Sequence, residues 1–137
     1  MRWAGHLRKV KILLADDHPG FPEMAERLLG SNFTVVAKVG NGQDMLEAAM
    51  RLQPDIIVSD ISMPVLNGMD AADLLIKSGC KARIIFLSVH VDSEFVRQSL
   101  LIGAFGYVVK SRIATELVSA IHEALAGHIF VSQDVSH

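Results

Sequence analysis

The fold of this chain is decided by the stretch Asp55-Ile56-Ile57-Val58-Ser59-Asp60-Ile61-Ser62-Met63-Pro64-Val65-Leu66-Asn67-Gly68. Its apolar run Ile56–Val58 is β-branched and too short for a helix, which is typical of a strand buried on both faces of a parallel sheet. A proline and a glycine then mark a loop, and Asp60 lies between the run and that loop. Because ligand crevices open at the carboxyl ends of parallel strands, we expect a site around the Asp60 carboxylate.

Four more apolar runs of strand length alternate with segments in which apolar residues recur at helical spacing. The runs cover Val10–Ala15, Thr34–Val39, Arg83–Leu87 and Phe105–Val109, and the helical segments cover Phe21–Leu29, Met45–Met50, Met69–Ile76, Ser93–Ile102 and Ile113–Leu125. Asp92 or Ser93 can cap the fourth helix. Because strands that alternate with helices are joined by right-handed crossovers, the sequence predicts an α/β fold, a doubly wound five-stranded parallel sheet with five helices on its two faces.

Composition limits the class of protein. The chain has 137 residues, of which 50% are hydrophobic and 20% are charged, and this suits one domain with one sizeable core. A formal net charge of -2 lacks the basic excess that binding to duplex nucleic acid or to a membrane surface requires. The single cysteine, Cys80, cannot form an internal disulfide, and no apolar run approaches the roughly 20 residues that span a bilayer. We therefore expect a cytoplasmic protein.

The expected domain covers residues 10–127. Residues 1–9 form an N-terminal extension whose basic residues precede no hydrophobic region, so the extension does not look like a secretion signal. Residues 128–137 show no strong helical period, and we interpret them as the start of a linker.

Polar side chains lie where the predicted strands end, namely Asp16, Asp17, Asp60, Ser88 and Lys110. The carboxyl ends of parallel strands share one edge of the sheet, so these side chains should converge there. Three carboxylates that lie close together repel one another, and a hard divalent cation with oxygen ligands relieves that repulsion. Mg²⁺ fits best, because it uses few protein oxygens and leaves positions for a phosphoryl oxygen.

A cation at this edge makes Asp60 tolerable as a nucleophile toward phosphorus. Lys110 supplies a compact positive charge for Asp60 and for phosphoryl oxygens, and the Ser88 hydroxyl can donate to the same oxygens. These residue types predict a site that forms and holds an aspartyl phosphate. The added charge of about -1.5 to -2 should draw Ser88 and Lys110 inward and vacate space for the Tyr107 ring, so that a change of charge becomes a change of packing.

Several motifs occur together in one order and spacing. They are the acidic pair Asp16-Asp17, the Asp60 loop with Met63-Pro64 and Asn67-Gly68, Ser88, and Tyr107 three residues before Lys110. Over about residues 10–127 the chain resembles the receiver domain of bacterial two-component response regulators. The resemblance implies a flavodoxin-like, CheY-like fold with strand order 2-1-3-4-5. It also implies a regulatory phosphoacceptor domain that is no enzyme beyond its own phosphorylation and dephosphorylation.

The resemblance assigns roles residue by residue. It makes Asp60 the phosphoacceptor, and it makes Asp17, Asp60 and the Ser62 carbonyl the ligands of Mg²⁺, with Asp16 acting through water. Ser88 becomes the hydroxyl of the switch, Lys110 binds the phosphoryl group, and Tyr107 is the aromatic residue whose rotamer follows Ser88. Ser62 and His90 each lie two residues past a site residue, so we name them as candidates for tuning the attack of water on the phosphoryl bond.

Three stretches are most similar to the subfamily in which a receiver precedes a LuxR-type helix-turn-helix DNA-binding domain, namely Leu13–His18, Gly103–Tyr107 and Gly127–Ser132. The resemblance implies a sensor histidine kinase as phosphoryl donor and transcription regulation through an output domain that is absent here. Apolar residues on the fourth and last helices favour a homodimer on phosphorylation. We expect contact with DNA only through the output domain and no contact with membranes.

Two residues depart from the family's pattern. Many receivers follow the lysine with a proline in a cis bond, whereas Ser111 follows Lys110, and a cis bond there would cost about 3 to 4 kcal/mol. The geometry of that bond stays open at this point. Ser88 stands where threonine is commoner, and it keeps the hydroxyl but loses a methyl group, so its rotamer is freer.

Other functions fit the same topology less well. A phosphatase with an aspartyl nucleophile needs a second acid/base carboxylate soon after it, but Ile61-Ser62 follows Asp60. A flavin or nucleotide module needs a glycine-rich anion loop rather than an acidic edge. A degenerate receiver that only docks partners is disfavoured by the complete set of site residues. The six histidines show no metal spacing, and we expect them to be exposed to solvent.

Overall fold

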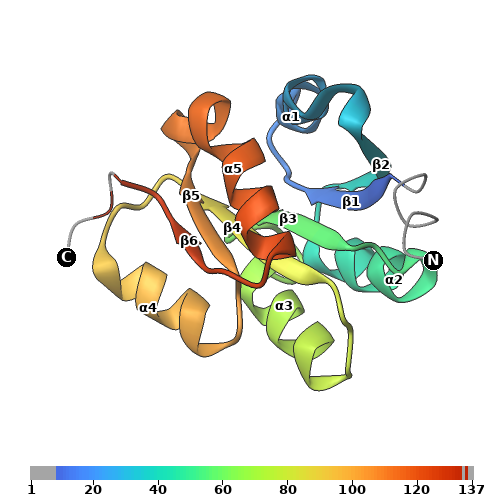
Figure 1. The fold of residues 1–137 in the computed structure, drawn as a ribbon. Helices are drawn as coiled ribbons and strands as arrows, with labels where there is room; N and C mark the ends of the chain where they lie inside the picture. Colours follow the sequence, from blue (N-terminus) through green and yellow to red (C-terminus); the bar gives the residue numbers. More distant parts are fainter. Residues whose placement is uncertain (1–8, 134, 136–137) are drawn as a thin grey trace.

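A six-stranded parallel sheet runs through the centre of the molecule in the order β2-β1-β3-β4-β5-β6 (Figure 1). The computed structural model describes residues 9–133 and 135. The strands are β1 (Val10–Ala15), β2 (Phe33–Val39), β3 (Ile56–Asp60), β4 (Arg83–Ser88), β5 (Gly106–Val109) and β6 (Phe130–Val131). The predicted parallel sheet and the order of its first five strands are confirmed. The predicted number of strands was wrong by one, because a short strand after the last helix pairs with β5.

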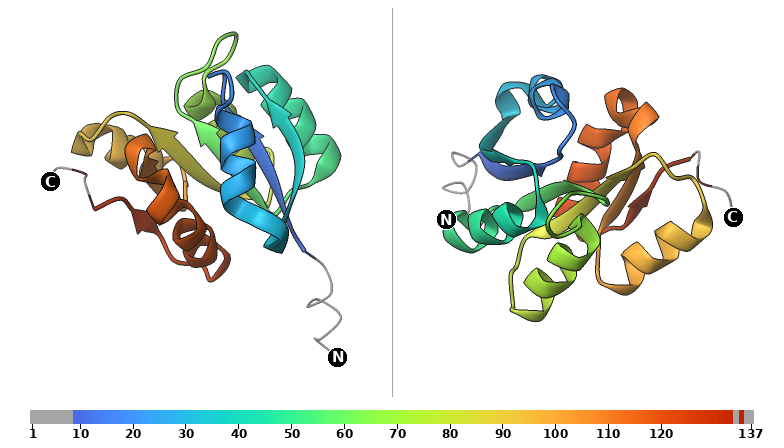
Figure 2. Two further views of the ribbon diagram at one scale, coloured as in Figure 1. Left: turned by 90° about the horizontal axis from the view of Figure 1, so that it is seen from above. Right: turned by 180° about the vertical axis from the view of Figure 1, so that it is seen from behind.

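Five α-helices cover the two faces of the sheet (Figures 1 and 2). They are α1 (Phe21–Leu29), α2 (Gly42–Leu52), α3 (Gly68–Lys77), α4 (Ser93–Leu101) and α5 (Ile113–Leu125), with short 3-10 turns η2 (Gly30–Asn32) and η3 (Lys110–Arg112). Successive residues of a strand point to opposite faces, so the buried side chains form two apolar layers. On β3, Ile57 belongs to the layer beneath α2, α3 and α4, while Ile56 and Val58 belong to the layer beneath α1 and α5.

Asparagine side chains start two of the helices that follow the strand ends. Asn41 Oδ1 accepts a hydrogen bond from the Asp44 amide at 2.8 Å, and Asn67 Oδ1 accepts one from the Asp70 amide at 2.8 Å. Asp92 holds the corresponding position before α4, but its side chain makes no capping hydrogen bond within the described residues. Helix α4 therefore begins without the side-chain cap that we predicted.

The segments predicted at the two ends of the chain, an N-terminal extension and the start of a linker, have different outcomes in the structure. The N-terminal extension predicted for residues 1–9 lies outside the described residues except for Lys9. Residues 128–137, which we interpreted as the start of a linker, include β6, where Phe130 pairs with Gly106 and Val131 pairs with Tyr107. The limits of the domain at residues 10 and 127 stay a prediction. No helix in the described part of the chain is long and apolar enough to cross a membrane.

Candidate functional site

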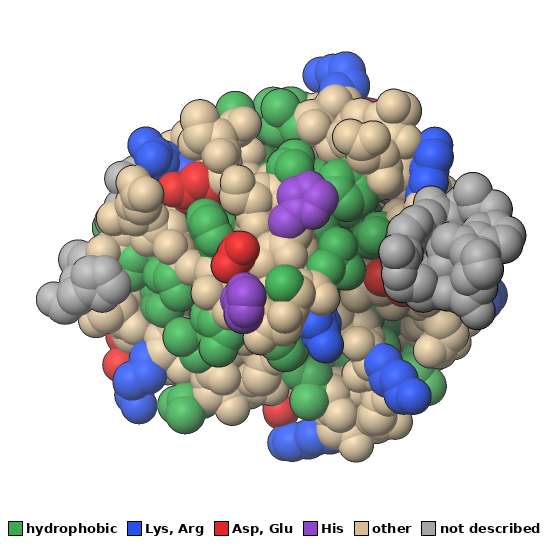
Figure 3. Space-filling view, viewed as in Figure 1, with side chains coloured by type: hydrophobic (Ala, Val, Ile, Leu, Met, Phe, Trp, Pro, Cys, Tyr) green, Lys and Arg blue, Asp and Glu red, His purple; other side chains and the backbone are tan. Residues whose placement is uncertain are grey.

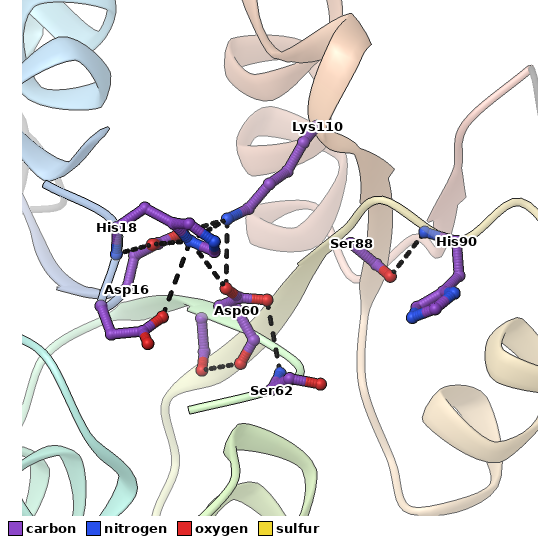
Figure 4. A network of polar contacts seen from close by, with 9 residues as sticks. Asp16, His18, Asp60, Ser62, Ser88, His90 and Lys110 are labelled. Carbon is purple, nitrogen blue, oxygen red and sulfur yellow. Dashed lines mark hydrogen bonds and ion pairs between the residues drawn. The ribbon is translucent and has the colours of Figure 1, made fainter. Parts of the chain in front are cut away.

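Asp16, Asp60 and Lys110 meet at the carboxyl edge of the sheet (Figure 4). Asp16 follows β1, Asp60 is the last residue of β3, and Lys110 comes directly after β5. The Lys110 Nζ atom lies 2.7 Å from Asp16 Oδ2 and 3.1 Å from Asp60 Oδ2. Three stretches that are far apart in the sequence thus supply one compact group of charges.

The charges of this group lie mostly out of solvent. Asp16 is 5% exposed and Asp60 is 6% exposed, and the side chain of Lys110 is 12% exposed. Two buried carboxylates share one ammonium group, so the site keeps an excess of negative charge. Asp16 Oδ2 is buried, and its contact with the described residues is the ion pair with the Lys110 ammonium group at 2.7 Å. A further positive charge at this point would relieve the excess.

Donor atoms for a cation lie close together at the same edge. One ligand atom from each of Asp16, Asp17, His18 and Asp60 lies within 4.8 Å of every other. Asp17 is the most accessible of the three carboxylates, since its side chain is 38% exposed. Carboxylate oxygens are the protein ligands that Mg²⁺ prefers, and the buried carboxylates of Asp16 and Asp60 share the single ammonium group of Lys110. The residues present therefore fit a divalent cation.

His18 is the member of this group that our reading of the sequence missed. Its side chain is 60% exposed, as we expected of the histidines, but its Nδ1 atom lies 2.8 Å from Asp16 Oδ1, 3.4 Å from Asp60 Oδ2 and 2.9 Å from Lys110 Nζ. One ring nitrogen can donate to Asp16 or accept from Lys110, but it cannot do both at once. The His18 amide also donates to Asp16 Oδ1 at 2.8 Å, and this short-range contact carries no spacing pattern that a sequence could reveal.

Ser62, Ser88 and His90 line a hollow of about 320 Å³ together with the charged residues. The Ser62 amide donates to Asp60 Oδ1 at 3.3 Å, which ties the loop after β3 to the carboxylate. The Ser88 Oγ atom is buried and accepts a hydrogen bond from the His90 amide at 3.0 Å. The hollow therefore presents a hydroxyl, a carboxylate and an ammonium group to whatever enters it.

Tyr107 lies inside the molecule rather than in the hollow. Its ring is fully buried, and its hydroxyl donates to the His90 carbonyl oxygen at 2.8 Å. Burial raises the pKa of the Tyr107 hydroxyl, so the group remains a protonated donor at neutral pH. The main chain of His90 thus contacts Ser88 through its amide and Tyr107 through its carbonyl group, which links the hollow to the interior.

The family profile described as the response regulator receiver domain matches residues 12–122. That match covers most of the chain. The chain belongs to the response regulator receiver family. Receiver domains are signalling domains of two-component systems rather than classical enzymes, and they bind Mg²⁺ at an acidic pocket. The acidic group of this receiver contains Asp16, Asp17 and Asp60.

The relatives of this receiver include transcription regulators of the NarL and LuxR type. The transcriptional regulatory protein DegU of Brevibacillus brevis is 34% identical over 131 residues, which cover 94% of this chain and 56% of DegU. The nitrate/nitrite response regulator protein NarL of Escherichia coli (strain K12) is 36% identical over 124 residues, which cover 89% of this chain and 57% of NarL. The receiver thus spans a little more than half the length of these curated relatives.

Solved structures of receivers share the same fold. A LuxR-family two-component response regulator from Aurantimonas sp. SI85-9A1 superposes with a TM-score of 0.88 at 33% identity, covering 93% of each chain. The signal receiver domain of the putative response regulator NarL from Mycobacterium tuberculosis superposes with a TM-score of 0.83 at 30% identity, covering 88% of this chain and 99% of that domain. The flavodoxin-like fold implied by the resemblance is therefore confirmed.

The peptide bond between Lys110 and Ser111 is trans, since the described residues contain no cis peptide bond. This settles the geometry that the sequence left open. Lys110 begins the short turn η3, and its side chain still reaches both carboxylates of the site.

Gly68 allows the loop after Asp60 to fold back against the end of β3. The Gly68 amide donates to the Ile61 carbonyl oxygen at 2.8 Å. A Cβ atom at this position would lie 1.9 Å from the Asp60 carbonyl oxygen and 2.7 Å from Ser59 Oγ, and the first of these is a backbone atom that cannot move without displacing Asp60. The close approach of the loop therefore requires glycine here.

We expect Gly68→Ala to lower the free energy of unfolding by about 2 to 3 kcal/mol, because the added methyl group overpacks a rigid contact. Urea unfolding followed by circular dichroism measures the loss. Gly40→Ala is the matched control, since a Cβ atom there meets no atom closer than 3.9 Å and should change the stability by less than about 0.5 kcal/mol. Equal stabilities of the two variants would contradict the close approach.

Burial makes the charged form of Asp60 unfavourable. It raises the pKa of this carboxyl above its ordinary value of 3.8, although the hydrogen bond and the charge of Lys110 oppose the change. A carboxyl group with a raised pKa in the folded state stabilises the fold most when it is protonated. That contribution is present below the ordinary pKa and is lost as the pH rises through the raised pKa.

We therefore expect Asp60→Asn to become more stable relative to the unmodified chain as the pH rises from 3.8 through the raised pKa of Asp60. The neutral amide has the shape of the carboxyl group but no charge to bury. Urea unfolding of both proteins in buffer with a chelator, at a series of pH values, measures the difference in unfolding free energy. A difference that shrinks as the pH rises would show that Lys110 outweighs burial.

Proposed function

We propose that this chain is the phosphorylation-dependent switch of a two-component transcription regulator and that Asp60 is its phosphoacceptor. The observation that carries the proposal is the position of the Asp60 carboxylate, which lies in the hollow with Lys110 Nζ 3.1 Å from its Oδ2 atom. The ammonium group can stabilise the carboxylate before transfer and phosphoryl oxygens afterwards. Membership of the receiver family supports the same reading.

The acidic residues in this proposal hold Mg²⁺. Asp17, Asp60 and the Ser62 carbonyl would contact it directly, and Asp16 would act through water. When bound, the cation supplies positive charge to phosphoryl oxygens. His18 lies against the same carboxylates, so its ring must share this space with the cation.

The switch in this proposal runs from Ser88 to Tyr107. The Ser88 oxygen accepts a hydrogen bond from the His90 amide, and its hydroxyl proton, which now lies near the Tyr107 hydroxyl, would turn to donate to a phosphoryl oxygen. A shift of Ser88 toward Asp60 would pull on the main chain of His90, whose carbonyl oxygen holds the Tyr107 hydroxyl. In the structure the Tyr107 ring points inward and is buried, and this is one of the two positions between which the ring would move in the proposed switch.

The proposed partners follow from the relatives. Because response regulators of the NarL and LuxR type partner with histidine kinases, a sensor histidine kinase is the proposed phosphoryl donor. DNA is proposed to be bound only through an output domain outside this sequence, and phosphorylation is proposed to favour a homodimer. A cytoplasmic location is proposed with these partners.

Intact-mass analysis after incubation with a small phosphodonor tests the proposal. With Mg²⁺ the chain should gain one phosphoryl group, and with a chelator in place of Mg²⁺ it should gain none. Hydroxylamine should release the group, because it cleaves an acyl phosphate and spares a phosphate ester on serine. A gain that resists hydroxylamine would assign the phosphoryl group to a hydroxyl such as Ser62 or Ser88 and would reject Asp60.

A further inference from the structure

Residues that follow α5 close the outer edge of the sheet. Strand β6 pairs in parallel with β5, with the Phe130 amide donating to the Phe105 carbonyl oxygen at 3.0 Å and the Ser132 amide donating to the Tyr107 carbonyl oxygen at 2.9 Å. Figure 1 shows β6 beside β5, between α5 and α4. An exposed edge strand is a template for pairing with another chain, so β6 removes that opportunity from β5.

Ser132 anchors this segment to two elements at once. The buried Val109 amide of β5 donates to Ser132 Oγ at 3.0 Å, and the Ser132 hydroxyl in turn donates to the carboxylate of Glu116 on α5. Glu116 is only 5% exposed, and its Oε2 atom lies 3.4 Å from Arg112 Nε. A carboxylate buried on α5 therefore receives part of its hydrogen bonding from a hydroxyl of the segment after α5 and part from Arg112.

The segment also reaches the apolar layer beneath α4. Val135 is 4% exposed and belongs to the same buried cluster as Tyr107 and Val96, and Val131 packs against that cluster. On the face that bears β6, hydrophobic side chains lie in separate patches between backbone and other side chains (Figure 3). The apolar contact and the Ser132 anchor together place the segment over the outer edge of the sheet.

We propose that the surface formed by α4, β5 and α5 docks this chain's own residues 130–133 and 135, and that the docked segment responds to the state of Asp60 through Tyr107. The second part rests on the function proposed above. Tyr107 joins the two regions, because its hydroxyl contacts His90 beside the hollow and its carbonyl oxygen holds the Ser132 amide. Its buried ring is also part of the apolar cluster that contains Val135.

The position of the Tyr107 ring should decide how firmly the segment docks. A Tyr107 ring that left the interior would withdraw a buried member of the cluster against which Val135 packs, so the segment docks best on the inward ring. A phosphoryl group that draws Ser88 toward Asp60 favours the inward ring and therefore the docked segment. In a longer protein, the residues that lead out of the receiver would be held on its surface when Asp60 is phosphorylated.

Amide hydrogen exchange measured by nuclear magnetic resonance on the full 137-residue chain tests both parts. The amides of Val109 and Ser132 report docking, because the segment makes both hydrogen bonds. We expect both to exchange at least about tenfold more slowly than in an unstructured chain. Ser132→Ala should accelerate exchange at Val109 by about fivefold to tenfold, since it removes the acceptor.

Two further variants separate the anchor from general destabilisation. Gln133→Ala is the matched control, because its exposed side chain makes no contact in the anchor while its amide keeps its bond to Glu116. Glu116→Gln keeps an acceptor for the Ser132 hydroxyl and should preserve most of the protection at Val109. Exchange at Val109 and Ser132 as fast as in an unstructured chain, or equal effects of Ser132→Ala and Gln133→Ala, would overturn docking.

Beryllofluoride with Mg²⁺, used as a mimic of the phosphoryl group, tests the coupling. It should slow exchange at Ser132 severalfold, and Tyr107→Ala should abolish that change. If the mimic binds and exchange at Ser132 stays the same, the coupling is wrong while the proposed function stands. If the mimic does not bind, the proposed function and the coupling both fail, and docking is judged by Ser132→Ala alone.

Discussion

Asp60→Asn is expected to take up no phosphoryl group under conditions in which the unmodified chain gains one. The amide of asparagine has no anionic oxygen to attack phosphorus. Asp16 also pairs with Lys110, but its side chain is more deeply buried than that of Asp60, and Asp16 is not among the described residues that line the hollow. Intact-mass analysis measures the difference directly. The effect is complete loss rather than a change of rate.

The control for this variant is Asp73→Asn. Asp73 lies on α3, pairs with Lys77 at 3.0 Å and is not among the described residues that line the hollow, so its loss should leave phosphoryl uptake unchanged. Asp60→Asn should also remain folded. Burial raises the pKa of Asp60 because it disfavours the charged carboxylate, and the neutral amide has no charge to bury. Equal labelling of Asp60→Asn and the unmodified chain would move the phosphoacceptor elsewhere.

Lys110→Met should have the largest effect on stability. It leaves Asp16 and Asp60 buried without their shared ammonium group, and breaking a buried ion pair by removing one partner costs about 3 to 5 kcal/mol. Urea unfolding at neutral pH with a chelator measures the loss. Addition of Mg²⁺ at about 100 times the variant's dissociation constant should raise its unfolding free energy by about 2.7 kcal/mol, because a cation that binds the folded state alone stabilises it by mass action.

Two comparisons decide whether charge causes this loss. Lys77→Met removes an exposed lysine that pairs with Asp73, and it should change stability by less than about 0.5 kcal/mol. For Lys110→Met the loss should shrink at acid pH, where protonated carboxyl groups no longer need a cation. If the loss is instead the same at acid and neutral pH, it belongs to the packing of the lysine over the Phe21 ring, which lies 4.5 Å from Nζ.

Much of the fold was predictable from local pattern. Strands β1 to β5 are short apolar runs bounded by turn residues, and α1 and α5 begin and end where their apolar spacing and glycines indicate. The carboxylates of the site were predictable for a related reason, because parallel strands place all their carboxyl ends at one edge. Asp16, Asp60 and Lys110 are far apart in sequence, yet the topology places them at the same edge, where the long side chain of Lys110 reaches both carboxylates.

Other features had no local signal. The carboxylate contacts of His18 depend on the rotamer of one exposed ring among three acidic residues. Strand β6 has only two residues, and its pairing is decided by the unpaired edge of β5 rather than by its own pattern. The anchor between Ser132 and Glu116 joins residues 16 positions apart on different elements.

The sequence by itself determined the order of strands and helices and the identity of the charges at the sheet edge, because hydrophobic periodicity and strand polarity act residue by residue. Only the tertiary structure decided how far each charge is buried, where the Tyr107 ring lies, and that the end of the chain covers β5. Burial and edge pairing depend on which surfaces meet after folding. No single segment of the chain carries that information.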